Sequence, residues 1–328
     1  MKKFMALITS QKQDGTFENK ICQKSIGALP LNDLLVKVEY SSLNYKDALS
    51  ASGAKGITKE YPHTPGIDVA GIIEESSNDH FSVGEKVIVT GFDLGMNTSG
   101  GFAEYVRVPS KWAIKCPNSL STKESMIIGT AGLTAGLCIA EIEKHKPLKD
   151  LKIIVSGATG GLGSIAAKLL SLLGSEVTAI TGKKNIDDFL YDLGCSNIIQ
   201  REDFINSTRL PLNRGNYDAA VDVAGGNILS CMIASMNYNG IITACGNVAS
   251  PKFETTVFPF ILRSNKLIGI DSANCSLKIR QKIWNNFSNI WRLSNLEKMC
   301  KTVDLNNLIN EIDKILSGRQ TGRVIIKI

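Results

Sequence analysis

Four glycines near the middle of the chain could do chemistry through their bare backbone. Gly157, Gly160, Gly161 and Gly163 follow an apolar run at 151–155 that is typical of a buried parallel strand. A helical pattern of apolar residues follows at once. The start of a helix carries unpaired N–H groups and a partial positive charge, and it can hold a pyrophosphate where no Cβ keeps the phosphate away. The spacing therefore predicts a dinucleotide site; the alternative is that the glycines only let strand and helix pack closely.

Two cations follow the next predicted strand. That strand, 176–180, ends in Thr181, Gly182, Lys183 and Lys184. In NAD sites an acidic residue in this region takes the ribose hydroxyls, and such an acid would repel the 2′-phosphate of NADPH. Because the acid is absent and Lys183 is present, the sequence favours NADPH over NADH. The alternative is that both lysines are solvated loop charges.

The elements that must position this turn alternate between strand and helix from residue 151 onward. Predicted strands are 151–156, 176–180, 197–200, 217–223, 240–244 and 267–270, and predicted helices are 162–173, 185–193 and 227–236. This alternation is typical of one parallel sheet with right-handed crossovers. The sequence thus predicts an α/β fold with a doubly wound sheet in this region.

Residues 1–124 follow a different pattern, with short strands and glycine-containing turns. The predicted strands are 34–40, 65–74, 83–91 and 102–108. Their regular spacing indicates a small barrel or sandwich. A helical pattern returns at 122–146, interrupted at 129–132, and further helices are predicted at 276–293 and 305–317. A last strand, 323–328, has no partner in the alternating region, so we expect it to return to the first domain.

The composition narrows the class of function. The chain has 328 residues, 43% of them hydrophobic, and a net charge of +6, which suits a soluble protein of about two domains. No basic run is interleaved with aromatics, and no stretch has the ~18 uninterrupted apolar residues of a membrane span. We therefore expect neither a nucleic-acid nor a membrane partner. The eight scattered cysteines show no zinc-ligand spacing with the three histidines, so we expect no metal and a cytoplasmic location.

Longer stretches carry a family resemblance over nearly the whole chain. They are SLNYKD at 42–47, PGIDVAG at 65–71, TG at 90–91, GGFAE at 100–104, MIIGTAG at 126–132 and TVFPFILR at 256–263. With these motifs the sequence resembles the zinc-free branch of the medium-chain dehydrogenase/reductase superfamily, in the group of bacterial acryloyl-CoA reductases that often carry quinone oxidoreductase names. In zinc alcohol dehydrogenases of this superfamily, a cysteine falls near position 44 and Gly-His-Glu near 66–68. This chain has Asn44 and Gly-Ile-Asp there.

The resemblance implies a fold, a reaction and an assembly. The implied fold has a GroES-like β-barrel catalytic domain at 1–124, completed by 273–328, and a Rossmann NADP-binding domain at 125–272. The implied reaction is the NADPH-dependent reduction of acryloyl-CoA, a small-molecule acyl-CoA, to propanoyl-CoA by hydride transfer. No Lewis acid is expected, which makes alcohol oxidation the less suitable chemistry. Members of the superfamily also lead us to expect a homodimer, paired through the 240–270 region.

The resemblance also assigns residues. It gives the pyrophosphate to Ala158, Thr159, Gly160, Gly161, Leu162 and Gly163. It places Thr181, Gly182, Lys183 and Arg201 around the 2′-phosphate, and Asn247, Ile261 and Ser272 on the nicotinamide side. Tyr45 is the catalytic candidate beside the nicotinamide, where it either packs on the cofactor or supplies a proton; the alternative is a tyrosine buried at a turn.

The chain departs from the family pattern in two places. The family usually has Ser-Gly-Arg where this chain has Thr181, Gly182 and Lys183, and a lysine lacks the planar fork of arginine. The loop at 92–99 is also less aromatic than in the family, which affects the acyl group if this loop lines the acyl pocket. Two other functions stay open: an NADPH:quinone oxidoreductase with the same fold, and a non-catalytic protein that binds NADPH or RNA.

Overall fold

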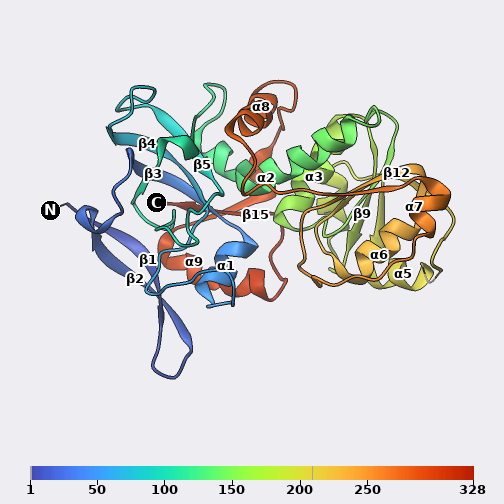
Figure 1. The fold of residues 1–328 in the computed structure, drawn as a ribbon, viewed down its shortest axis with the longest axis horizontal. Coiled ribbons are helices and arrows are strands. Elements are labelled where there is room, and N and C mark those ends of the chain that lie inside the picture. The colour runs from blue at the N-terminus through green and yellow to red at the C-terminus, as the bar shows by residue number, and fades with distance from the viewer. Residues whose placement is uncertain (1, 209) are drawn as a thin grey trace. The chain divides into compact units, whose positions relative to one another are not determined.

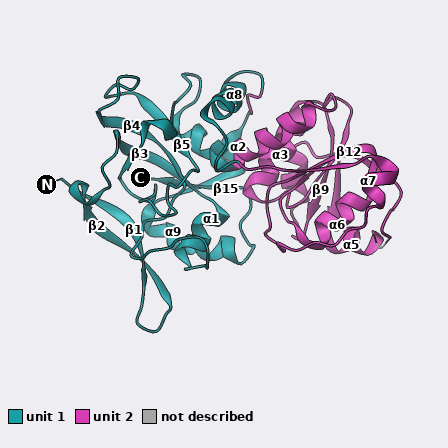
Figure 2. Cartoon of the chain, in the orientation of Figure 1, with its two compact units in different colours: residues 1–130, 272–290, 294–328 teal, residues 131–271, 291–293 magenta. Residues whose placement is uncertain are grey.

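The protein is described by a computed structural model that covers residues 2–208 and 210–328 (Figure 1). Its chain divides into two units (Figure 2). Unit 1 contains Met1–Thr130, Ser272–Ile290 and Ser294–Ile328, and unit 2 contains Ala131–Asp271 and Trp291–Leu293. The sequence places the first domain boundary at 124/125, whereas the units divide at 130/131. The difference arises because the first turns of helix α2 (Thr122–Glu143) pack among residues of unit 1.

Unit 2 is built on a six-stranded sheet in the order β10-β9-β8-β11-β12-β13, in which every pair is parallel. The strands are β8 (Lys152–Val155), β9 (Glu176–Thr181), β10 (Asn197–Gln200), β11 (Tyr217–Asp222), β12 (Met236–Ala244) and β13 (Lys266–Gly269). The predicted parallel sheet is therefore confirmed. The strand order reverses between β8 and β11, and in such sheets ligands bind beyond the carboxyl ends of the strands at the reversal.

Helices connect these strands. They are α3 (Gly161–Leu172), α4 (Asp187–Asp192), α5 (Arg201–Ser207), α6 (Gly226–Ala234) and α7 (Phe258–Arg263). Helix α3 packs on β8 and β9, and α6 packs on β12. Ile154, Ile228 and Met232 belong to one buried cluster that joins the sheet to α6. Helices α5 and α7 were not predicted, because six or seven residues are too few to show a helical period.

Unit 1 contains a seven-stranded sheet and a hairpin. The sheet has the order β14-β15-β3-β4-β5-β7, with β6 paired to β3. Its strands are β3 (Leu34–Leu43), β4 (Asp68–Ser76), β5 (Lys86–Thr90), β6 (Tyr105–Val108), β7 (Ala113–Lys115), β14 (Cys300–Val303) and β15 (Arg323–Lys327). The hairpin of β1 (Lys3–Gln11) and β2 (Phe17–Ser25) was not predicted. Strand β15 pairs with β3, with Val324 opposite Leu43, so the predicted return of the C-terminal strand is confirmed.

Three helices complete unit 1 together with the first turns of α2. They are α1 (Tyr45–Ala51), α8 (Leu277–Ser288) and α9 (Leu305–Leu316), and single turns of 3-10 helix occur at Ile26–Ala28, Ser110–Trp112 and Leu296–Met299. Helices α1 and α9 pack on each other, and Ala48, Leu308 and Ile312 share one buried cluster with Leu43 and Val324. The core thus ties α1 to the pair β3–β15.

Helix α2 breaks where the sequence shows its glycines. Gly129 has φ 50° and ψ −157°, which is outside the helical region, so the predicted interruption is confirmed. By length and composition α2 could cross a membrane, but 78% of its most apolar window is buried inside the protein. These properties are those of a core helix.

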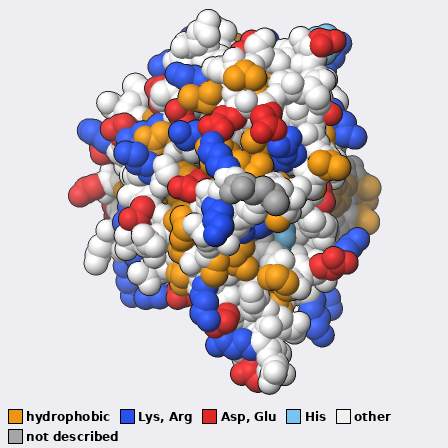
Figure 3. All heavy atoms as spheres, turned by 90° about the vertical axis from the view of Figure 1, so that its left-hand side faces the viewer, with side chains coloured by type: hydrophobic (Ala, Val, Ile, Leu, Met, Phe, Trp, Pro, Cys, Tyr) orange, Lys and Arg blue, Asp and Glu red, His pale blue; other side chains and the backbone are white. Residues whose placement is uncertain are grey.

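The surface of unit 1 mixes charges of both signs. Figure 3 shows basic and acidic side chains interspersed with apolar and uncharged ones on one face. Ion pairs in this unit include Lys2–Glu74 at 2.8 Å, Lys20–Glu18 at 2.9 Å and Arg107–Glu75 at 2.6 Å. Such exposed pairs contribute little to stability.

Candidate functional site

The glycine turn between β8 and α3 is a close-fitting cradle. Gly157 has φ +58°, a conformation that favours glycine, and a Cβ on Gly163 would lie 2.3 Å from the Gly157 carbonyl oxygen. Gly160 is the N-cap of α3, and no side chain caps the helix there. The first amides of a 12-residue helix therefore face the turn without a side-chain acceptor. Bare amides of this kind fit a pyrophosphate.

A buried carboxylate anchors the turn from the neighbouring strand. Asp222, at the end of β11, accepts hydrogen bonds from the Ser156 hydroxyl at 2.7 Å and from the Gly225 amide at 2.9 Å. Burial raises the pKa of Asp222, and these hydrogen bonds oppose that rise. Ser156 directly precedes the glycines, so Asp222 fixes the turn to β11. This role was missed at the level of sequence, because Asp222 lies within a predicted strand and belongs to no motif.

The residues assigned to the 2′-phosphate lie together at the ends of β9 and β10. Thr181 ends β9, and its hydroxyl accepts the Lys183 amide at 3.0 Å. A Cβ on Gly182 would lie 3.0 Å from the central carbon of the Arg201 guanidinium, so this guanidinium rests on the glycine. Burial lowers the pKa of the Lys183 amine, since desolvation penalises its charge. The cationic side chains of Lys183 and Arg201 suit an anionic group such as a 2′-phosphate.

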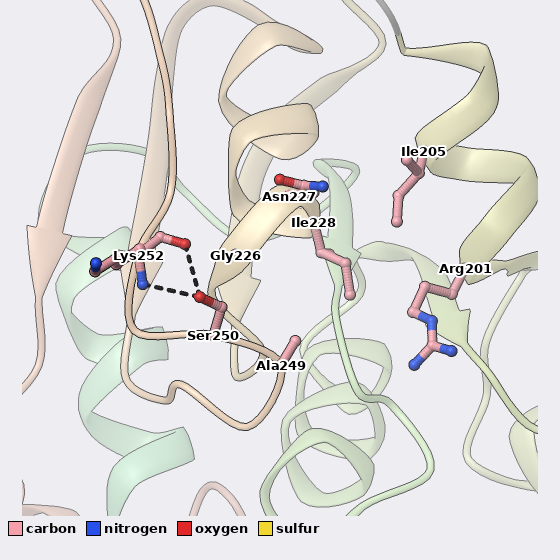
Figure 4. Close-up of a pocket in the computed structure, with 8 residues that line it drawn as sticks. All are labelled: Arg201, Ile205, Gly226, Asn227, Ile228, Ala249, Ser250 and Lys252. Atoms are coloured by element: carbon pink, nitrogen blue, oxygen red, sulfur yellow. Dashed lines mark hydrogen bonds between the residues drawn. The ribbon is translucent and has the colours of Figure 1, made fainter.

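Arg201 also lines a cavity of about 370 Å³ (Figure 4). In that view Arg201 and Ile205 of α5 face the loop 249–252 across the cavity, with the start of α6 at its back. The lining residues are Arg201, Ile205, Gly226, Asn227, Ile228, Ala249, Ser250 and Lys252. The loop is ordered by Ser250, whose hydroxyl donates to the Lys252 carbonyl and accepts the Lys252 amide, both at 3.0 Å. A flat, partly apolar group next to a phosphate would suit this lining.

The three residues assigned to the nicotinamide side belong to three different segments, two in unit 2 and one in unit 1. Asn247 follows β12 and is exposed, at the same sheet edge as the glycine turn. Ile261 lies on α7 with 68% of its surface exposed. Ser272 belongs to unit 1, where its carbonyl accepts a hydrogen bond from Arg280 at 2.7 Å. Their shared role stays a prediction.

In unit 1, a buried ion pair lies beside the motif that contains Tyr45. Asp68 is fully buried and accepts hydrogen bonds from the Ser42 hydroxyl at 2.6 Å and the Asn44 amide group at 2.8 Å. Its carboxylate also accepts the Thr130 amide and hydroxyl. Arg323, on β15, is 3.8 Å from the Asp68 carboxylate and donates to the Asn44 side-chain oxygen at 3.1 Å. Through the bond from the Thr130 amide, Asp68 also ties the backbone of α2 to this cluster.

The break at Gly129 serves this ion pair. A Cβ on Gly129 would lie 2.6 Å from the Asp68 carboxylate and 2.8 Å from the Arg323 guanidinium. The break leaves carbonyls without helical partners, and Arg323 donates to the Ile127 carbonyl at 2.9 Å. The freed Thr130 amide pairs with Asp68 at 2.9 Å. Both charges are therefore hydrogen-bonded, as buried charges must be.

Tyr45 is the first residue of α1 and is half-buried. A second buried carboxylate, Asp47, accepts the Asn44 amide at 2.8 Å and so caps the helix. Its other oxygen accepts the Ile67 amide at 2.8 Å. Burial, together with the charge of Asp68, raises the pKa of Asp47 to about 7. The cap holds the backbone of Tyr45 in place next to Asn44.

Sequence reasoning missed Arg323 as a member of this cluster. Arg323 reads as one residue of a C-terminal strand, and only the pairing of β15 with β3 brings it to Asp68. Asp47 lies within SLNYKD, and its spacing of three from Asn44 matches a capping box, which could have identified the start of α1. Among the residues that the structure describes, no group of three or more His, Cys, Asp and Glu side chains could hold a metal ion.

Comparison with known proteins places these features in a family. The sequence model of the alcohol dehydrogenase GroES-like domain matches residues 30–118. YhfP of Bacillus subtilis (strain 168), which has a provisional quinone oxidoreductase name, is 38% identical over 303 residues, covering 92% of each chain. The acrylyl-CoA reductase AcuI of Ruegeria pomeroyi is 34% identical over 327 residues, covering 99% of each chain.

Solved structures resemble this protein over nearly its whole length. The yhdH oxidoreductase of Salmonella enterica, solved in complex with NADP, has a TM-score of 0.94 at 36% identity and covers 99% of each chain. The Bacillus subtilis protein yhfP, solved with NAD bound, has a TM-score of 0.96 at 35% identity and covers 100% of each chain. The chain thus belongs to the medium-chain dehydrogenase/reductase superfamily, in the group that contains acrylyl-CoA reductases and proteins with quinone oxidoreductase names.

Proposed function

We propose that the protein is an NADPH-dependent oxidoreductase that reduces the carbon–carbon double bond of acryloyl-CoA, or of a similar short enoyl-CoA, to the saturated acyl-CoA. The observation that carries the proposal is the glycine cradle of unit 2, with two cations at the end of β9 and no acid there. The relative named acrylyl-CoA reductase supports the choice of substrate.

The chain's own residues would bind the cofactor in two places. The amides at the start of α3 would donate hydrogen bonds to the pyrophosphate, and Gly163 leaves room for this close approach. Lys183 and Arg201 would hold the 2′-phosphate. When bound, NADPH supplies the hydride for the β-carbon of the substrate. Tyr45 would then pack beside the nicotinamide, and the proton for the α-carbon would come from an acid or from water.

Metal ions have no part in the proposed reaction. The positions that resemble the cysteine and the Gly-His-Glu of zinc alcohol dehydrogenases hold Asn44 and, at 66–68, Gly-Ile-Asp. The carboxylate of Asp68 is occupied by four hydrogen bonds and by the nearby Arg323. The negative charge that develops on the thioester oxygen would be met by hydrogen-bond donors instead.

The preference for NADPH can be tested by one pair of substitutions. Lys183→Ala should raise the KM for NADPH far more than the KM for NADH, because only NADPH carries the 2′-phosphate. Lys184→Ala is the matched control, since Lys184 is the exposed neighbour of Lys183. Equal effects of Lys183→Ala on both cofactors would contradict this role. The test is needed because one solved relative holds NADP and another holds NAD.

The reaction itself is tested with a panel of acceptors. The protein is assayed with NADPH against several enoyl-CoAs and several quinones, with and without a chelator. We expect the highest kcat/KM for a short enoyl-CoA and no effect of the chelator. A higher kcat/KM for quinones would favour the second candidate, an NADPH:quinone oxidoreductase, which the name of YhfP supports. Loss of turnover on removal of metals would overturn the metal-free mechanism.

We also propose that the protein forms a homodimer through β13. This strand is the last of its sheet, so one of its edges has no neighbour within the six strands. The helix before it, α7, exposes Phe258, Ile261 and Leu262. A second copy that pairs with this edge would cover both features. Size-exclusion chromatography with light scattering should give twice the mass of the chain, and a monomer alone would refute the proposal.

A further inference from the structure

A second buried arginine of unit 1 takes no part in the function described so far. Arg280 lies on α8 with 1% of its surface exposed. Its Nε donates to the Cys275 carbonyl at 3.1 Å, and one terminal nitrogen donates to the Thr90 carbonyl at 2.6 Å and the Thr90 hydroxyl at 3.0 Å. The other terminal nitrogen donates to the carbonyls of Ser272 and Ala273, at 2.7 and 2.6 Å. All five N–H groups of the guanidinium therefore have an acceptor.

The same guanidinium holds the first residue of the loop 92–99. It lies over the ring of Phe92, 4.1 Å from the ring centroid, and this ring also stacks on Trp112 with centroids 5.6 Å apart and planes 3° apart. Phe92 has φ +54°, a conformation that costs free energy for a bulky residue. Its amide donates to the Ala273 carbonyl at 3.0 Å. The contacts with Arg280 and Trp112 and this hydrogen bond hold Phe92 in a strained conformation.

A short path of hydrogen bonds leads from this point to Tyr45. The Gly91 amide donates to the Ile67 carbonyl at 2.8 Å. The Ile67 amide donates to Asp47, whose carboxylate also accepts the amide of Asn44, the N-cap residue of α1 that precedes Tyr45. Residues 90–92, which Arg280 contacts, are thus two hydrogen bonds away from the helix that starts with the catalytic candidate.

We infer that Arg280 is a positioning residue: it fixes the start of the loop 92–99 and the segment 272–275 relative to the cap of α1. Through these segments it positions the substrate that accepts the hydride. This inference rests on the proposed function for the role of Tyr45. Arginine is required because lysine has three donors and no planar group to stack on Phe92.

Hydrogen exchange tests the positioning without any substrate. In Arg280→Lys, the amides of Ile67, Gly91 and Phe92 should exchange about tenfold faster, because at least two hydrogen bonds that hold their segments are lost. Ile283→Ala is the control, since Ile283 is a buried residue of the same helix. It should destabilise α8 without this local effect. Equal exchange in wild type and Arg280→Lys, or the same pattern in both variants, would overturn the inference.

Kinetics test the consequence for the reaction. Arg280→Lys should lower kcat/KM for the acceptor about tenfold or more, because small displacements of positioned groups are costly. The Kd for NADPH, measured by fluorescence without an acceptor, should stay within about twofold of wild type, because the phosphate-binding residues lie in unit 2. An equal loss of kcat/KM in Ile283→Ala would show a merely structural role. If wild type reduces no acceptor of the panel, the proposed function fails, and hydrogen exchange alone decides the inference.

Discussion

The pH dependence of stability should carry the signature of Asp47. The pKa of this carboxyl is raised from its ordinary 3.8 to about 7, first by burial and then by the charge of Asp68. Between about pH 4 and pH 7 the folded protein therefore holds a proton that the unfolded chain has released. The free energy of unfolding should fall as pH rises through this window and become level above about pH 7. The gap between 3.8 and about 7 corresponds to about 4 kcal/mol.

The variant Asp47→Asn isolates this contribution. It removes the titration, and it also removes one acceptor from the pair of backbone amides that Asp47 holds, which adds a cost of about 1–3 kcal/mol that does not depend on pH. Urea unfolding followed by tryptophan fluorescence would give the free energy for both proteins from pH 4.5 to 8.5. The difference between wild type and variant should change by about 3 kcal/mol over this range, in the direction that favours wild type at low pH.

A second capping aspartate provides the control. Asp304 caps α9 through the Asn307 amide at 2.9 Å, and hydrogen bonds lower its pKa. For Asp304→Asn the difference should stay level from pH 4.5 to 8.5, because the stability that a lowered pKa adds is already fully present above the ordinary value of 3.8. If the Asp47→Asn difference were constant within about 0.5 kcal/mol from pH 4.5 to 7.5, the assigned environment of Asp47 would be wrong.

Three further substitutions test the site. Gly163→Ala should raise the Kd for NADPH about tenfold and destabilise the protein by about 1–3 kcal/mol, because the new Cβ would meet the Gly157 carbonyl oxygen at 2.3 Å; an unchanged Kd in a fluorescence titration would contradict the cradle. Tyr45→Phe should leave kcat at saturating NADPH within about twofold of wild type, whereas a loss of 10²-fold or more, estimated for an acid catalyst, would identify Tyr45 as the proton donor. Asp68→Asn leaves the buried Arg323 without its counter-charge and should cost about 3–5 kcal/mol in a calorimetric or urea measurement; a cost below about 1 kcal/mol would refute the importance of the ion pair.

The parts of the fold that the sequence predicted are those with local signals. The parallel strands of unit 2 are continuous apolar runs, and the glycines mark both the turn before α3 and the break in α2. Strand β2 was missed because its sequence, FENKICQKS, has no fully buried position and no clean alternation. Helix α1 has seven residues, too few for a period, and its start depends on the cap between Asn44 and Asp47.

The candidate site was predictable in unit 2 and only in part in unit 1. The cradle and the cations lie in segments whose motifs are contiguous in the sequence. The partners Asp68 and Arg323 lie near opposite ends of the chain, and no property of either segment alone indicates the other. No sequence pattern indicates the role of Arg280 either, because a cation on an amphipathic helix is ordinarily expected to be exposed to solvent. Tertiary packing determines the burial and the partners of such residues, and a local sequence pattern does not predict this packing.

The return of β15 to β3 has a consequence for the synthesis of the protein. Strand β3 and Asp68 leave the ribosome before residues 131–271 are translated, but their partners Val324 and Arg323 are translated after them. The 131–271 part of unit 2 is complete long before that, and we expect it to fold during translation. Until β15 has emerged, β3 keeps an unpaired edge and the Asp68 carboxylate lacks its counter-charge. The nascent protein should therefore depend on chaperones most strongly through its first hundred residues.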